Sequence, residues 1–152
     1  MPVPPLSLVP SHLNCLQVIS ARLKADNNTQ GPGDLYSLGL TDDTIANHIL
    51  QDKRLPTLRF RWEQAGEWDT KDSAGHDGWY IVDIWVSERG DKKALQIADR
   101  VIALLHNLPF TITNTANPAQ SLILRHDFMD AFVEPDGTTH HTVLRFQHIV
   151  TN

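Results

Sequence analysis

Apolar residues recur at helical spacing in two long stretches of the chain. The first stretch predicts a helix over residues 11–25, in which Ser11 is a favourable N-cap and the apolar positions are Leu13, Leu16, Ile19 and Leu23. The second predicts a helix over residues 92–107, which Asp91 would cap and whose apolar stripe is Ala94, Leu95, Ala98, Val101, Ile102 and Leu105. We expect a shorter helix over residues 41–50, because Thr41 precedes two acidic residues that suit the positive end of a helix dipole.

From Leu58 onward the apolar residues alternate with polar ones, which is the period of a β-strand. One face of this first strand would be apolar, and the other would carry Arg59 and Arg61. Residues 64–78 are acidic and contain three glycines, so we predict a loop there.

The strand predicted over residues 79–86 differs, because both of its faces are apolar. One face is formed by Tyr80, Val82, Ile84 and Val86, and the other by Trp79, Ile81, Asp83 and Trp85. A strand of this kind is normally covered on both sides. The helix over residues 92–107 would cover one face, which leaves the face around Asp83 in need of another partner.

The C-terminal third predicts a short strand over residues 110–113 and two long strands over residues 122–133 and 141–150. Residues 134–137 join the long pair, since Pro135 presets φ and Gly137 accepts a positive φ. The predicted fold is therefore α+β, with a mainly antiparallel sheet of four to five strands, two or three helices packed mostly on one face, and a long C-terminal β-hairpin. Proline-rich residues 1–10 would form an extended arm, and residues 11–152 a single domain.

Charge is concentrated in one segment. The net charge is −5, and residues 63–91 contain eight acidic residues against Lys71 and Arg89, a local charge of −6. A tight nucleic-acid binder needs a basic stripe, which this sequence lacks, whereas an acidic patch suits a basic partner or a surface that must not hold nucleic acid. The sequence contains neither a signal-peptide pattern nor an apolar run long enough for a membrane span, so we expect no membrane partner.

The second face of the 79–86 strand is the candidate interface. Asp83 lies among apolar residues, where an unpaired charge would be costly, and the neighbouring strand supplies two arginines that could pair with it. Because Trp and Arg dominate interface energetics, we predict a subunit contact formed by Arg59, Arg61, Trp79, Ile81, Asp83 and Trp85. The alternative is that the first helices or the N-terminal arm cover this face within one chain.

Evidence for catalysis is weaker. The most polar cluster is His126, Asp127, Asp130 and His148, but parity places the two aspartates on opposite faces of their strand. His140 and His141 are adjacent in a strand, so they cannot share one metal ion. The single Cys15 excludes an intrachain disulfide and is expected to be a buried packing residue. We therefore predict no catalytic residues, no cofactor and no metal.

The order of elements resembles the tail terminator or tail-completion proteins of tailed phages. Three stretches carry the resemblance: Leu55-Pro56 before the first strand, residues 79–86 followed by the Ala-rich helix over 93–105, and the closing hairpin that ends in Val143-Leu144-Arg145-Phe146. The resemblance implies a structural protein of the virion tail, assembled in the host cytoplasm, with no catalytic residues. It also implies a homo-oligomeric ring, commonly a hexamer, that caps the tail tube and joins it to the head or neck.

Under this interpretation the partners would be further copies of the chain, the tail tube protein and a neck or connector protein. DNA would pass through the lumen without specific binding, and the acidic candidates for the lumen or a partner-facing loop are Glu63, Glu67, Asp69, Asp72 and Asp77. A small dimeric interaction module and an enzyme that uses the His and Asp cluster are the alternatives.

Overall fold

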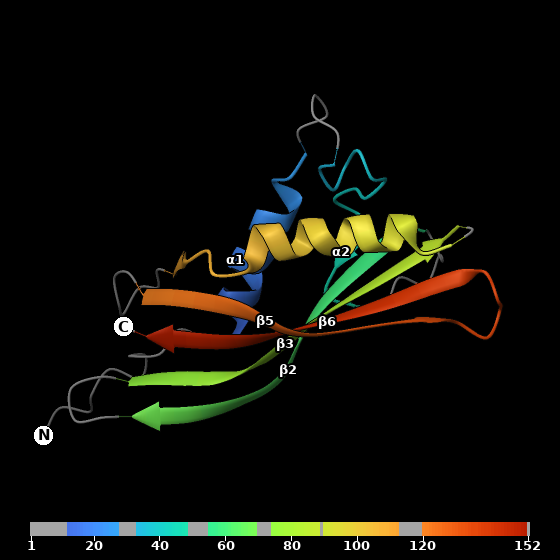
Figure 1. Cartoon of the computed structure of the whole chain (residues 1–152). Helices are drawn as coiled ribbons and strands as arrows, with labels where there is room; N and C mark the ends of the chain where they lie inside the picture. Colours follow the sequence, from blue (N-terminus) through green and yellow to red (C-terminus); the bar gives the residue numbers. More distant parts are fainter. Residues whose placement is uncertain are drawn as a thin grey trace, which may run out of the picture.

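A curled sheet forms the base of the molecule, and two helices lie on one of its faces in the computed structural model (Figure 1). The structure describes residues 12–27, 33–48, 55–69, 74–88, 90–112 and 120–151. Along the chain the elements are α1 (His12–Lys24), β1 (Ile45–Ala46), β2 (Thr57–Asp69), β3 (Ala74–Ser87), α2 (Lys92–Leu105), β4 (Phe110–Ile112), β5 (Gln120–Val133) and β6 (Thr139–Thr151). The predicted α+β class is confirmed.

The sheet has six strands, in the order β1-β2-β3-β6-β5-β4. Our prediction of four to five strands was therefore too low, because the two-residue β1 is too short to leave a pattern in the sequence. β1 pairs with β2 in parallel and every other neighbouring pair is antiparallel, so the sheet is mixed. The long C-terminal hairpin is confirmed as β5 and β6, and its turn has Gly137 at φ +76°.

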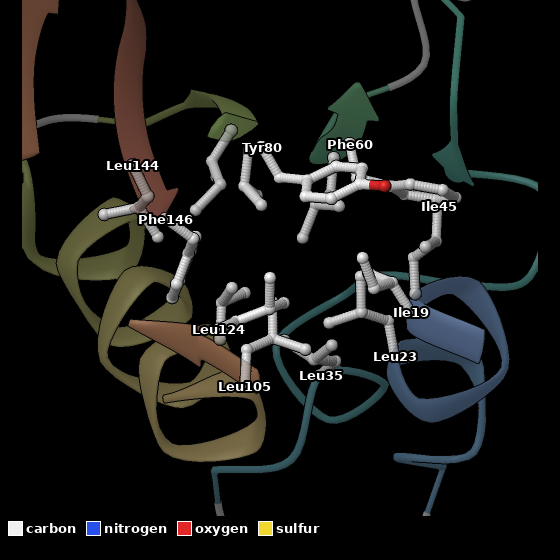
Figure 2. Close-up of a cluster of buried hydrophobic side chains, with 14 of the residues drawn as sticks. Ile19, Leu23, Leu35, Ile45, Phe60, Tyr80, Leu105, Leu124, Leu144 and Phe146 are labelled. Carbon is white, nitrogen blue, oxygen red and sulfur yellow. The ribbon is translucent and has the colours of Figure 1, made fainter. Parts of the chain in front are cut away.

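The core lies between the helices and one face of the sheet (Figure 2). Tyr80 and Phe146 are among its largest fully buried side chains, and Figure 2 shows them in the same cluster as Ile19 and Leu23 of α1 and Leu105 of α2. The α2 side of the core consists of Ala94, Ile97, Ala98, Val101 and Leu105. Cys15 is completely buried in α1 and belongs to the same cluster, as expected of a packing residue.

The helix predicted over residues 41–50 is wrong as far as the structure describes the segment, which is to residue 48. Turns at residues 42–44 lead into β1. The carbonyl oxygen of Thr44 accepts hydrogen bonds from the Leu58 amide, at 2.8 Å, and from the Thr57 hydroxyl, at 3.0 Å. Pairing with β2 therefore overrides the local helix signal, as tertiary contacts often do for a short segment.

The loop predicted over residues 64–78 is also wrong for the residues of this segment that the structure describes, which are 64–69 and 74–78. β2 continues to Asp69 and β3 begins at Ala74, with the two strands paired from Asp69↔Ala74 inward. A register shift between Trp62 and Gln64 marks a bulge at Glu63. Two paired strands can contain glycines, although the same glycines indicate a loop when only the local sequence is considered.

The ends of α2 differ slightly from the prediction. The helix stops at Leu105 and the Asp91 side chain makes no capping hydrogen bond, although the Asp91 carbonyl accepts the Leu95 amide at 2.9 Å. Within the described ranges, neither helix is long and apolar enough to span a membrane.

Candidate functional site

The face of the sheet opposite the helices carries the candidate site, and we call it the helix-free face. Cross-strand partners define its rows, and three of them run Thr57–Trp85–His141–Phe132, Arg59–Asp83–Val143–Asp130 and Arg61–Ile81–Arg145–Phe128. Within the part of the chain that the structure describes, both helices lie on the other face (Figure 1). The helices therefore do not provide the cover that one of our alternatives required, and the N-terminal arm lies outside the described residues.

Asp83 is the centre of a charged cluster on this face. Its Oδ2 accepts hydrogen bonds from Arg59 Nη2 at 2.7 Å, Arg59 Nε at 3.1 Å and Arg61 Nε at 3.3 Å. Its Oδ1 lies 2.9 Å from His141 Nε2, and His141 Nδ1 lies 2.9 Å from Glu134 Oε1. The structure thus confirms that Asp83 pairs with both arginines, and it adds His141 and Glu134. We call these five residues the Asp83 cluster.

The cluster keeps a buried carboxylate ionised. Asp83 is only 2% exposed. Burial alone would raise the pKa of this carboxyl group, but hydrogen bonds from His141 and Arg59 and the charges of both arginines outweigh it, so the pKa is lowered. Asp83 is therefore a fixed negative charge that orders three basic side chains from two neighbouring strands.

Aromatic rings and guanidinium groups cover the rest of the face. The His141 ring stacks on Trp85 at 4.6 Å and meets Phe132 at 4.7 Å, measured between ring centroids. The Arg145 guanidinium lies 4.5 Å from the Trp79 ring centroid and 5.4 Å from that of Phe128. Arg59 lies over Trp85 at 5.3 Å. Long side chains thus shield Asp83 and Ile81, which is 4% exposed.

All six residues predicted for the interface lie together on this face. Asp83 and Ile81 are buried, Arg59, Trp79 and Trp85 are half-buried, and Arg61 is 39% exposed. The prediction missed other contributors to the face, namely Glu134, His141, Phe132 and Arg145. His141 could be assigned to one face of its strand from sequence, but its position opposite Trp85 depends on a register that the sequence does not reveal.

The His and Asp cluster of the enzyme alternative is not assembled. His148 is fully buried against Tyr80, at 4.7 Å between ring centroids, and pairs in the ladder with Leu124 rather than His126. We predicted that Asp127 and Asp130 lie on opposite faces of their strand, but a bulge between His126 and Phe128 interrupts the alternation of faces. As a result, Asp127 Oδ1 lies 3.1 Å from Arg145 Nε. Among the described residues, no group of three or more His, Cys, Asp or Glu side chains is arranged to hold a metal.

The four acidic candidates that the structure describes lie on strands rather than in a loop. Glu63 is exposed at the β2 bulge. Glu67 and Asp69 belong to β2 and Asp77 belongs to β3, with side chains outside the described part, and Asp72 lies outside the described residues altogether. Their role as a lumen or a partner-facing surface stays a prediction.

Comparisons with known proteins give a family and a fold. The family model described as "Tail completion protein gp17" matches residues 17–151. A solved chain from the virion of a native gene transfer agent particle is similar with a TM-score of 0.69 and 14% identity, over 93% of this chain and 100% of that one. A second solved chain is similar with a TM-score of 0.56 and 14% identity, over 93% and 96% of the two chains. No curated protein sequence matches.

Proposed function

Because the chain belongs to the tail completion protein gp17 family, and is thus a structural component of a virion tail, we propose that it forms a ring at the end of the tail tube. This ring, with six copies as the expected number, joins the tail to the head or neck. Its partners are further copies of the chain, the tail tube protein and a neck or connector protein. The role is structural and not catalytic.

The observation that carries the proposal is the extent of the family match. Residues 17–151 include most of α1 and every strand, so the match covers the sheet, both helices and the helix-free face. The likeness to a chain of the gene transfer agent particle, at 14% identity, supports the same fold.

The helix-free face gives this proposal a physical basis. It presents indole rings and guanidinium groups that no described helix covers, and such groups dominate the energetics of protein interfaces. A ring needs two different surfaces on each copy, since head-to-tail contacts close into a ring only when the rotation between copies closes. We infer that the helix-free face contributes to at least one of them.

The charge distribution supports a passage for DNA. The segment over residues 63–91 has a local charge of −6 in the sequence, although Asp83 is buried against Arg59 and Arg61 and Glu88 pairs with Lys93. The remaining acidic residues would repel the phosphate backbone. DNA would therefore slide through the lumen without being held.

The proposal is tested by assembling particles with and without the gene for this chain. Without the protein, heads and tails should accumulate as separate structures in electron micrographs, and adding purified protein should restore joined particles. Joined particles in its absence would overturn the proposal. A protein that forms only twofold dimers and does not bind tubes would favour a dimeric interaction module instead.

A further inference from the structure

We propose which surfaces meet between neighbouring copies: the outer edge of β5 in one copy docks against the β2 side of the next copy. We define the β5 edge as residues 127–133 and the β2 side as Arg59, Arg61 and Trp62. This inference rests on the proposed ring and assigns the contact that closes it.

The β5 edge is open in the single chain. β4 pairs with β5 only over residues 120–122. Next to that, the Asn107 amide donates to the Leu124 carbonyl at 2.8 Å, and His106 Nδ1 accepts the His126 amide at 3.0 Å. Beyond residue 126, no strand in the described ranges pairs with the outer side of β5. The Ala131 amide bonds instead to Asp130 Oδ1 at 2.9 Å, which indicates that it points away from β6.

This open edge is apolar on both of its faces. Seven large hydrophobic side chains are exposed among the described residues, and four of them lie within this short segment: Phe128 (46% exposed), Met129 (44%), Phe132 (45%) and Val133 (50%). The register places the two phenylalanines on the helix-free face and Met129 and Val133 on the opposite face. Edge strands of monomers normally avoid such exposure, so this segment has the properties of a contact surface.

Charge complementarity identifies the occupant as a second copy. On the β2 side, the two guanidinium groups of Arg59 and Arg61 share the single carboxylate of Asp83, which leaves one excess positive charge within this group, and Arg61 is 39% exposed. Glu63, exposed at the β2 bulge, lies outside this group. The β5 edge has the opposite sign, because Asp130 is exposed and Arg145 already neutralises Asp127. Trp62, at 41% exposed, adds an apolar group to the β2 side.

The two surfaces also lie at matching heights along the strands. Asp130 occupies the same row as Arg59, and Phe128 the same row as Arg61. β3 and β6 lie between them, so in one chain the β2 and β5 backbones are separated by three strand spacings, roughly 14 Å. If the strands run along the ring axis, rotation about that axis keeps each row at its height and brings Asp130 of one copy level with Arg59 of the next, two residues along β2 from the more exposed Arg61.

A double-mutant cycle on the full chain tests this contact. We would compare wild type, Asp130→Ala, Arg61→Ala and the double variant by sedimentation over a range of concentrations, alone and with tail tubes. Each single variant should raise the concentration for half-assembly about fivefold, and the double variant should raise it no further than the larger single effect. Urea unfolding of the dilute monomer should show additive effects of the two substitutions, because the side chains lie on separate strands of one chain.

A second pair of variants tests the apolar part of the surface. Met129→Lys should weaken assembly at least tenfold, since a lysine on an edge strand opposes docking. Leu108→Lys is the matched control, because Leu108 is 45% exposed but lies in the connection between α2 and β4, and it should assemble like wild type.

The outcomes separate this inference from the proposed ring. Rings that form equally well with Met129→Lys, and additive assembly effects of Asp130→Ala and Arg61→Ala, would overturn the inference alone. A wild-type protein that stays monomeric at every concentration and with tubes would overturn both.

Discussion

At the scale of single residues, the Asp83 cluster has the largest expected effect on stability. In Asp83→Asn, two arginines lose a buried counter-charge and His141 loses its carboxylate partner, and removing one partner of a buried ion pair typically costs about 3 kcal/mol. We therefore expect the free energy of unfolding in urea to fall by about that amount. Asp99→Asn, at an exposed position of α2, should change it by less than about 0.5 kcal/mol. Equal stability of Asp83→Asn and wild type would contradict the central role of this carboxylate.

Acid should destabilise the fold through two aspartates. A hydrogen bond from Arg100 lowers the pKa of Asp26, whose carboxylate lies 2.6 Å from Arg100 Nη2 and also accepts the Leu35 amide at 2.9 Å. The pKa of Asp83 is lowered as well. A carboxyl group whose pKa is lower in the folded state stabilises the protein above the unfolded pKa, about 3.9, and this stabilisation is lost as the pH falls through the folded value.

We therefore expect the urea midpoint to decrease steadily as the pH is lowered below about 4. In Asp26→Asn the midpoint should be lower at neutral pH and should depend less on pH in the acid range, because one of the two groups no longer titrates. Parallel pH profiles for Asp26→Asn and wild type would show that Asp26 contributes nothing to the acid response.

The single thiol should be unreactive in the folded protein. Cys15 is fully buried, and burial raises the pKa of its thiol to about 11. A thiol reagent at pH 8 should modify the native protein at least a hundredfold more slowly than the urea-unfolded chain, as followed by mass spectrometry. Rapid modification of native protein would mean that α1 opens easily from the sheet.

At the scale of elements, two glycines should respond differently to the same substitution. Gly137, in the β5–β6 turn, has φ +76° and open space where a Cβ would lie, so Gly137→Ala should cost only the backbone strain, about 1 kcal/mol. Gly39 has φ +102°, and its added Cβ would lie 3.1 Å from Pro56 Cγ. Gly39→Ala should therefore lower the unfolding free energy more than Gly137→Ala does, and the reverse order would contradict the packing described.

The elements also show what local pattern can and cannot predict. The α2 stripe and the alternation along β3 were recognised, because each repeats over many residues and reflects one buried face. β1 and the ends of β2 and β3 were missed, because their structure depends on partners distant in sequence, such as the bond from the Leu58 amide to Thr44. The same holds for the candidate site. The alternation of faces along the strands predicted that the arginines lie on the same face as Asp83, whereas the position of His141 depends on the β3–β6 register, which the sequence does not reveal.

At the scale of the whole molecule, the sheet separates two functions. One face holds the helices and the core, and the other presents an ordered layer of charged and aromatic side chains. The open β5 edge lies at one side of this layer and Arg61 at the other. This asymmetry is what a head-to-tail ring requires of each copy.

The most direct test of the account is to image tail tubes that have been incubated with the purified protein, by electron cryomicroscopy, and to determine the symmetry of any added density. We expect a closed ring at one end of each tube, with six copies and with β5 of each copy beside β2 of the next. Tubes with bare ends at saturating protein, or single copies scattered along their walls, would contradict the account.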